Sequence, residues 1–163
     1  MKQSVGWTLA IAVIAAIVAG IFALVAKRVP EKKSDNVPSG TRGRILRPQA
    51  NTVVGRSFTV SGEHFDLPKG YHVWLAVEIG TLLWPKEPEV PTADKRWSVK
   101  IVEGGNPPGG LFSLTLFQVP PEGNKFIVRW HEHGRSTGDF PGLNASDIPG
   151  FSRLDVVENL RLQ

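Results

Sequence analysis

"YHVWLAVEI", residues 71–79, carries a clear signal of secondary structure. Its alternate positions are apolar: Tyr71, Val73, Leu75, Val77 and Ile79. Successive side chains of a β-strand point to opposite faces of the sheet, so these five side chains share one face. The opposite face carries His72, Trp74, Ala76 and Glu78. The stretch therefore predicts a β-strand with one buried face.

Shorter alternating runs, separated by Gly- and Pro-rich turns, recur through the region from Ile45 to the C-terminus. They are "SFTVSG" (57–62), "WSVKI" (97–101), "FSLTLF" (112–117) and "RLDVVENLRL" (153–162). In the last run, the even-numbered positions are apolar, so a regular strand would point them to one face: Leu154, Val156, Leu160 and Leu162. Strands with one buried face and one solvent-exposed face are typical of antiparallel sheets. About seven such strands predict an all-β, antiparallel two-sheet sandwich over residues 45–163. A small β-barrel gives the same pattern and remains the alternative.

The same region resembles the small Ig-like β-sandwich modules of bacterial surface and signalling proteins. The residues that carry the resemblance are "ILRPQANTVVGRSFTVSG", "YHVWLAVEI", "LLWP", "RWSVKI" and "GGLFSLTLFQV". It covers about residues 45–120, and residues 134–150 are not part of the pattern. The resemblance implies an accessory or binding unit, and it brings no catalytic residues with it.

The composition and the absence of known motifs limit the kinds of active or metal site that the chain can form. The 163 residues hold no cysteine, which excludes disulfides, thiolate metal sites and cysteine nucleophiles. The sequence has no Walker loop, nucleophile elbow, HExxH motif or dinucleotide fingerprint. We therefore expect a protein that is not an enzyme and has no cofactor.

The N-terminus predicts a membrane anchor over residues 1–28. The apolar core, residues 7–26, would span about 30 Å as a helix, the hydrocarbon thickness of a bilayer. A cleaved signal peptide is the alternative, but its apolar region would be shorter. Small residues four apart, such as Ala12, Ala16 and Gly20, leave open a homodimer formed through this transmembrane helix.

Residues 29–44 are rich in charged and turn-forming residues and predict a basic, flexible tether. Lys27, Arg28, Lys32 and Lys33 are candidates for contact with anionic lipid. Residues 1–44 hold seven Lys/Arg and two acids, against twelve and thirteen in residues 45–163. The positive-inside rule therefore favours a cytoplasmic domain, although short N-terminal anchors often leave their domain outside. The domain itself is not basic overall, so we expect no nucleic-acid partner.

The stretch "FIVRWHEHG", residues 126–134, raises the question of a metal site. Interpreted as a strand, it places His131 and His133 on one face, about 7 Å apart. Zinc sites need three or four ligands, and Arg129 on the same face would repel a cation. The favoured interpretation is the polar end of a strand, with these two histidines kept as metal candidates.

The tryptophans divide into two groups. Trp97 and Trp130 lie on the apolar faces of their predicted strands, so we expect both to pack in the core. Trp74 and Trp84 are candidates for ligand or partner contact, together with the neighbouring His72 and Glu78. The long segments 84–96 and 134–150 predict loops that are either functional or mobile.

Together these features predict a single-pass, membrane-anchored, non-catalytic binding or assembly module, with membrane lipid and another protein as partners. The first alternative is an extracytoplasmic module that binds carbohydrate or cell wall. The second is a metal-dependent enzyme at His131 and His133.

Overall fold

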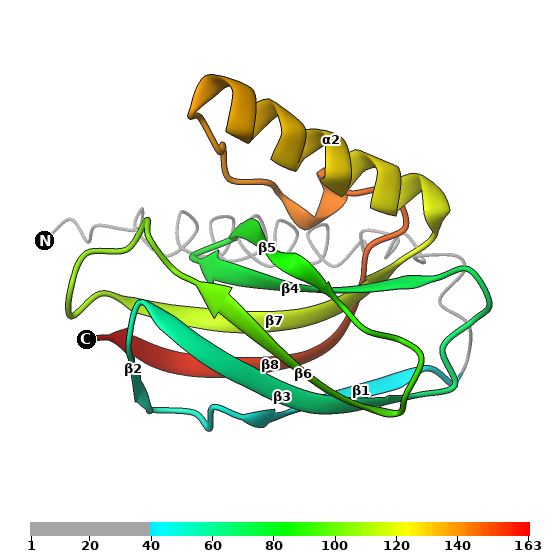
Figure 1. The fold of residues 1–163 in the computed structure, drawn as a ribbon, viewed down its shortest axis with the longest axis horizontal. Helices are drawn as coiled ribbons and strands as arrows, with labels where there is room; N and C mark the ends of the chain where they lie inside the picture. Colours follow the sequence, from blue (N-terminus) through cyan, green and yellow to red (C-terminus); the bar gives the residue numbers. More distant parts are fainter. Residues whose placement is uncertain (1–39) are drawn as a thin grey trace, which may run out of the picture. The chain divides into compact units, whose positions relative to one another are not determined.

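The strands form two sheets in the computed structural model, which describes residues 40–163 (Figure 1). The smaller sheet is antiparallel and has the order β1-β3-β6, formed by β1 (Arg42–Arg47), β3 (Ser57–Phe65) and β6 (Arg96–Val102). The larger sheet has the order β2-β8-β7-β4-β5. It comprises β2 (Val53–Val54), β4 (His72–Ile79), β5 (Leu82–Val90), β7 (Leu111–Val119) and β8 (Ser152–Leu162). Only the short β2 pairs in parallel, with β8, so the prediction of a mainly antiparallel, two-sheet fold is confirmed.

The main core lies between the sheets and follows the alternation of the strands. In β6, Trp97, Val99 and Ile101 point inward and are buried, while the residues between them are exposed. Gly62 of β3 stands opposite Trp97, and a Cβ at Gly62 would lie 2.3 Å from the indole ring. Glycine is therefore what lets Trp97 lie flat across β3, and the core prediction for Trp97 is confirmed.

The prediction of which side chains share one face of the last strand is wrong in part. Pairing between β7 and β8 shifts register twice, and Asn159 has a positive φ of 58°. Each extra residue in a bulge turns the following side chains to the other face. Val157 therefore occupies the core with Leu160 and Leu162, while Val156 is only half-buried.

The all-β prediction is wrong for residues 121–137, which form helix α2 (Pro121–Thr137). Proline at the first helical turn suits the start of a helix, because its missing N–H would have no partner there. The helix ends at Gly138, whose φ of 78° is left-handed and whose N–H donates to the Gly134 carbonyl at 2.8 Å.

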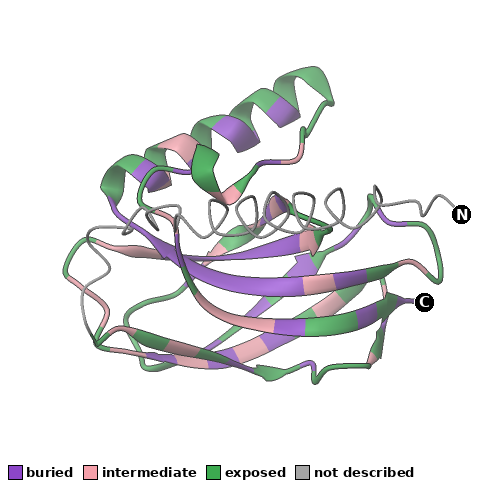
Figure 2. Ribbon diagram, turned by 180° about the vertical axis from the view of Figure 1, so that it is seen from behind, coloured by how far each residue is buried: buried purple, intermediate pink, exposed green. Residues whose placement is uncertain are grey.

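Helix α2 covers the outer face of the five-stranded sheet, on the side away from the three-stranded sheet (Figures 1 and 2). A second core joins Ile127 and Trp130 of α2 to Trp74 and Ala76 of β4, and to Phe117 of β7. Both faces of β4 are therefore buried at its centre. Core packing of Trp130 is confirmed, although Trp130 lies on a helix and not on a strand.

The segment after α2 also packs on this layer. Residue Leu143 forms an isolated antiparallel bridge with Leu83 of β5, and a 3-10 helix, η1 (Ala145–Asp147), leads into β8. Residues 84–90, which were predicted as part of a loop, belong to β5. Strand β1 begins at Arg42, so the last three residues of the range predicted as a tether pair with β3.

No helix among residues 40–163 is long and apolar enough to cross a membrane. The predicted anchor, most of the tether and the four candidate lipid contacts Lys27, Arg28, Lys32 and Lys33 lie outside the described residues.

Candidate binding cavity

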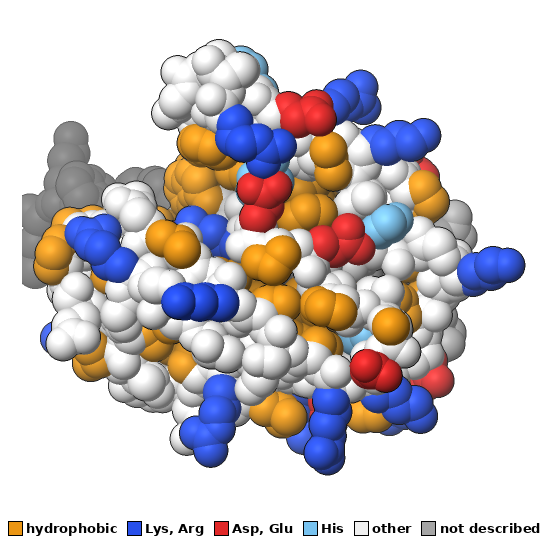
Figure 3. Space-filling view, viewed as in Figure 1, with side chains coloured by type: hydrophobic (Ala, Val, Ile, Leu, Met, Phe, Trp, Pro, Cys, Tyr) orange, Lys and Arg blue, Asp and Glu red, His pale blue; other side chains and the backbone are white. Residues whose placement is uncertain are grey.

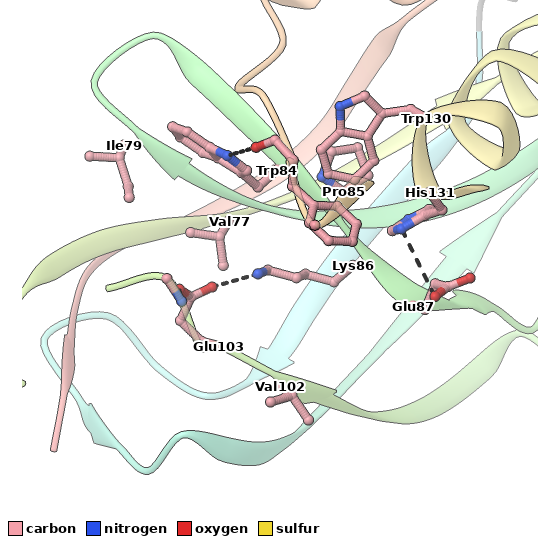
Figure 4. Close-up of a pocket in the computed structure, with 14 residues that line it drawn as sticks. Val77, Ile79, Trp84, Pro85, Lys86, Glu87, Val102, Glu103, Trp130 and His131 are labelled. Carbon is pink, nitrogen blue, oxygen red and sulfur yellow. Dashed lines mark hydrogen bonds and ion pairs between the residues drawn. The ribbon is translucent and has the colours of Figure 1, made fainter. Parts of the chain in front are cut away.

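A cavity of about 630 Å³ opens where the free edges of the two sheets, β5 and β6, meet the C-terminal half of α2. Figure 3 shows hydrophobic side chains gathered at the centre of this face, with acidic and basic side chains beside them. The lining residues come from β4, β5, the end of β6 with the turn after it, and α2 with the segment after it. They are Val77, Ile79, Trp84, Pro85, Lys86, Glu87, Val102, Glu103, Gly104, Gly105, Trp130, His131, Gly138 and Phe140 (Figure 4).

The apolar wall is held in place by contacts around Trp84 and Phe140. The indole N–H of Trp84 donates to the Phe140 carbonyl at 2.9 Å. The Phe140 ring packs edge-on against Trp130, with 5.4 Å between the ring centroids. A Cβ at Gly134 would lie 2.1 Å from that ring, so Gly134 makes room for Phe140 beside α2. The Phe140 side chain stays 40% exposed, which leaves part of an aromatic surface open to a ligand.

A buried ion pair forms another part of the lining. Lys86 Nζ lies 2.6 Å from Glu103 Oε2, and the side chains are only 17% and 3% exposed. The other oxygen of Glu103 accepts hydrogen bonds from the backbone N–H groups of Gly105 and Asn106, at 2.9 and 2.8 Å. The pair connects β5 to the end of β6, so it holds the two sheet edges together beside the cavity. A buried carboxylate needs such partners, because burial removes its hydration.

The imidazole of His131 lines the cavity from α2. It stacks on Trp74 with 5.7 Å between centroids, and its Nδ1 lies 3.9 Å from the Glu87 carboxylate. Burial lowers the pKa of His131 below its usual 6.5, and the nearby cations Arg135 and Lys86 act in the same direction. The Glu87 carboxylate opposes this shift, but Glu87 is also bound by Arg135 through both its oxygens at 2.9 Å. His131 is therefore a neutral, mostly apolar part of the wall at neutral pH.

The four predicted contact residues do not come together. Trp84 lines the cavity, but Trp74 is 3% exposed beneath α2 and donates its N–H to Asn124 Oδ1 at 2.9 Å. His72 and Glu78 stand near opposite ends of β4, about 20 Å apart at 3.3 Å per residue. His72 pairs with Glu89 at 2.7 Å, and Glu78 pairs with Arg153 at 2.9 Å and accepts a hydrogen bond from Thr115.

The structure corrects the reasoning that placed His131 and His133 on one face. An α-helix turns by about 100° per residue, so side chains two positions apart point to nearly opposite sides of the helix. His131 is accordingly buried against the sheet and His133 is exposed. Within residues 40–163 no group of three or more His, Asp or Glu side chains is placed to hold a metal ion.

Sequence reasoning missed Phe140, Lys86 and Glu103 as members of one site. They come from three segments that are distant in sequence, and no local motif connects them. Lys86 lies in the Pro-rich segment 84–96 that was interpreted as a loop, and Glu103 directly precedes a Gly- and Pro-rich turn at residues 104–110. Only Trp84, an aromatic residue in a polar stretch, carried a local signal.

A scan against models of known protein families gives no match, and no curated protein matches the chain.

Proposed function

We propose that the chain is a membrane-anchored, non-catalytic binding module with an Ig-like sandwich, whose cavity at the β5–β6 edge takes up an apolar group of its partner. The observation that carries this proposal is the cavity itself. Its volume of about 630 Å³ falls within the range of known ligand pockets, about 300–1,000 Å³. Aromatic and aliphatic side chains with a few polar groups form its wall, as ligand sites typically require.

A binding role fits the polar groups of the cavity better than catalysis does. Lys86 and Glu103 neutralise each other, and Glu103 is further held by two backbone N–H groups. None of the fourteen lining residues is a Ser or Thr, and the carboxylates of Glu87 and Glu103 are held by Arg135 and Lys86. General acid–base or nucleophilic catalysis needs a reactive group within reach of a base, and these groups are already paired.

The apolar wall indicates the chemistry of the partner group. Trp84 and Phe140 offer ring surfaces, and Ile79 and Val102 are 40% and 61% exposed at the cavity. An aromatic or branched aliphatic group, presented by a protein partner, would bury these surfaces and gain about 25 cal/mol per Å² of apolar area. Rigid aromatic anchors of this kind dominate protein interfaces.

The proposal includes a membrane anchor because residues 7–26 are apolar and uncharged. It would confine the cavity near the membrane and raise its effective concentration for a partner there. The charge distribution favours a cytoplasmic domain. The chain has no native cysteine, so Ser136→Cys can be probed with a membrane-impermeant thiol reagent. Labelling only after lysis supports the cytoplasmic side, and labelling of intact cells overturns it.

Site-specific photo-crosslinking tests the cavity. A benzophenone amino acid replaces Phe140 in the full chain, in native membranes, and the adducts are identified by mass spectrometry. The matched control carries the same amino acid at Val128, which is 38% exposed on α2 away from the cavity. A specific adduct from position 140 and none from position 128 is expected. Equal adducts from both positions would refute a cavity-based function.

Carbohydrate binding outside the membrane is the second candidate, and the half-exposed indole of Trp84 in the cavity favours it. Trp74, the other tryptophan predicted as a contact residue, lacks the exposed ring that sugar stacking needs. A glycan pull-down that Trp84→Ala weakens, with the domain labelled outside the cell, would replace the first candidate with this one.

A further inference from the structure

The outward face of the three-stranded sheet carries a group of cations that the cavity does not use. In β6 the inward residues are Trp97, Val99 and Ile101, so Arg96 and Lys100 point outward. The register of β1 with β3 and of β3 with β6 sets Arg44 and Arg96 on either side of Glu63. All five cations on these outward positions are exposed, and we call them the basic face: Arg42, Arg44, Arg47, Arg96 and Lys100.

This charge is concentrated on one side of a nearly neutral domain. Residues 40–163 hold fourteen Lys/Arg and thirteen Asp/Glu, a net charge of +1. The basic face combines five cations with the single outward acid Glu63, a local net charge of +4. Nine cations and twelve acids remain elsewhere, a net charge of −3. The net charge is therefore positive on this face and negative over the remaining described residues taken together.

The described residues leave the basic face open. Helix α2 covers the other sheet, and Figure 3 shows Lys and Arg side chains along the lower margin, where Figure 1 places the three-stranded sheet. Asp66, just beyond β3, pairs with Arg42 at 3.8 Å but leaves the other four cations without a salt bridge among the described residues. The apolar side chain of Leu46, in the edge strand β1, is 41% exposed. Val102 at the end of β6 is 61% exposed and borders both this face and the cavity.

We propose that the basic face lies against a bilayer surface of anionic lipid. The orientation rests on the proposed anchor, whereas the charge complementarity stands without it. Strand β1 starts fourteen residues after Arg28, a reach of at most about 50 Å, so an anchored domain cannot leave the vicinity of the membrane. The chain enters the domain through β1, which belongs to this face. Cations with interspersed apolar side chains suit the headgroup region of a bilayer.

The expected strength follows from the number of cations. Each Lys or Arg close to an anionic membrane strengthens the contact about fivefold at low salt. Reversing three of the five should therefore weaken the contact by roughly a hundredfold or more. With the basic face on the bilayer, α2 lies on the far side of the domain (Figure 1), and the cavity lined by β5, β6 and α2 lies between the two.

Headgroup quenching measures this contact in the full chain. A fluorophore is attached to Ser98→Cys on the outward face of β6, or to the control Ser136→Cys at the end of α2, both exposed positions. Each protein is mixed with vesicles of phosphatidylcholine alone or with about 30% phosphatidylserine, both containing a headgroup-linked quencher. We expect quenching at position 98 in anionic vesicles at low salt, and little at position 136 or in neutral vesicles.

Charge variants complete the test. Arg44→Glu/Arg96→Glu/Lys100→Glu should abolish quenching at position 98. Lys69→Glu/Lys125→Glu/Arg161→Glu, with the same charge change off the face, should keep it. Vesicle flotation in high salt reports separately on the anchor. Flotation without quenching at position 98 overturns the basic-face contact and keeps the anchor. Quenching without flotation keeps the contact and removes the anchor. Equal loss in both triple variants, or binding to RNA or an acidic protein in place of vesicles, also overturns the contact.

Discussion

Replacing Lys86 with methionine leaves the Glu103 carboxylate buried without its cation. Methionine has nearly the length of lysine and no charge, so the change removes the ion pair at little cost in packing. Breaking one side of a buried pair typically costs about 3–5 kcal/mol. Glu103 keeps two backbone hydrogen bonds, and Lys86 is 17% exposed, so we expect about 3 kcal/mol, the lower end of this range.

The double variant Lys86→Met/Glu103→Gln separates loss of the cation from loss of packing. Glutamine keeps an oxygen for the N–H groups of Gly105 and Asn106, but its amide nitrogen lacks an acceptor. That loss costs about 1–2 kcal/mol, so the double variant should be more stable than Lys86→Met alone. Such a recovery is the signature of an uncompensated charge.

Urea unfolding of the full chain in mild detergent, followed by tryptophan emission, measures both variants. With an m-value of about 2 kcal/mol per molar, Lys86→Met should lower the midpoint by about 1.5 M. The exposed Lys100→Met is the control and should stay within about 0.5 kcal/mol of the parent. A Lys86→Met midpoint as high as that of the control, or a double variant less stable than the single one, would show that Lys86 does not neutralise a buried charge at Glu103.

Three further predictions concern α2. Ile127→Ala should lower the free energy of unfolding by about 2–5 kcal/mol, because Ile127 is fully buried. Val128→Ala, on the exposed side of α2, should lower it by under about 1 kcal/mol. Equal urea midpoints would mean that α2 does not pack on the sheet. His131 stays neutral in the fold and binds a proton when unfolded, so stability should fall as pH drops through about 6.5. His131→Phe should flatten this dependence between about pH 7.5 and 5.5, and an unchanged slope would contradict the burial effect. Arg135→Ala, which breaks the exposed contact with Glu87, should change the urea midpoint by the equivalent of less than about 1 kcal/mol, and a larger loss would mean that the pair is more than a surface contact.

The strands were predictable because alternation is a local signal. Strands β4, β6 and β7 match their predicted ranges to within two residues at either end, and their core faces are as expected. Strand β5 was missed because Pro85 and Pro88 interrupt its pattern, which an edge strand tolerates.

Helix α2 was missed for a different reason. Its buried positions follow the helical spacing, but two of them are glycines and one is His131, so the apolar period is diluted. The short piece "FIVRW" then alternates well enough to be interpreted as a strand. The signal that could have corrected this is Trp74 on the second face of β4, because a large apolar side chain there needs a covering layer.

The cavity was beyond sequence reasoning, because it depends on how edges and loops meet. Trp84 was identified as a contact residue, but its partner surface comes from Phe140, fifty-six positions later. Long-range contacts of this kind are set by the packing of α2 and by Gly134 beneath the Phe140 ring. No spacing rule connects the two residues.

Native mass spectrometry of the full chain, purified from its own host, measures directly whether the cavity holds a partner. Gly104 lines the cavity, and a Cβ there meets no atom within 4 Å, so Gly104→Leu places a larger side chain at the cavity with no close contact at its Cβ. Gly55→Leu is the matched control, since Gly55 lies outside the lining and has similar room. We expect a bound partner on the parent and on Gly55→Leu that is lost from Gly104→Leu. The same bound mass on all three proteins would contradict a binding function for the cavity.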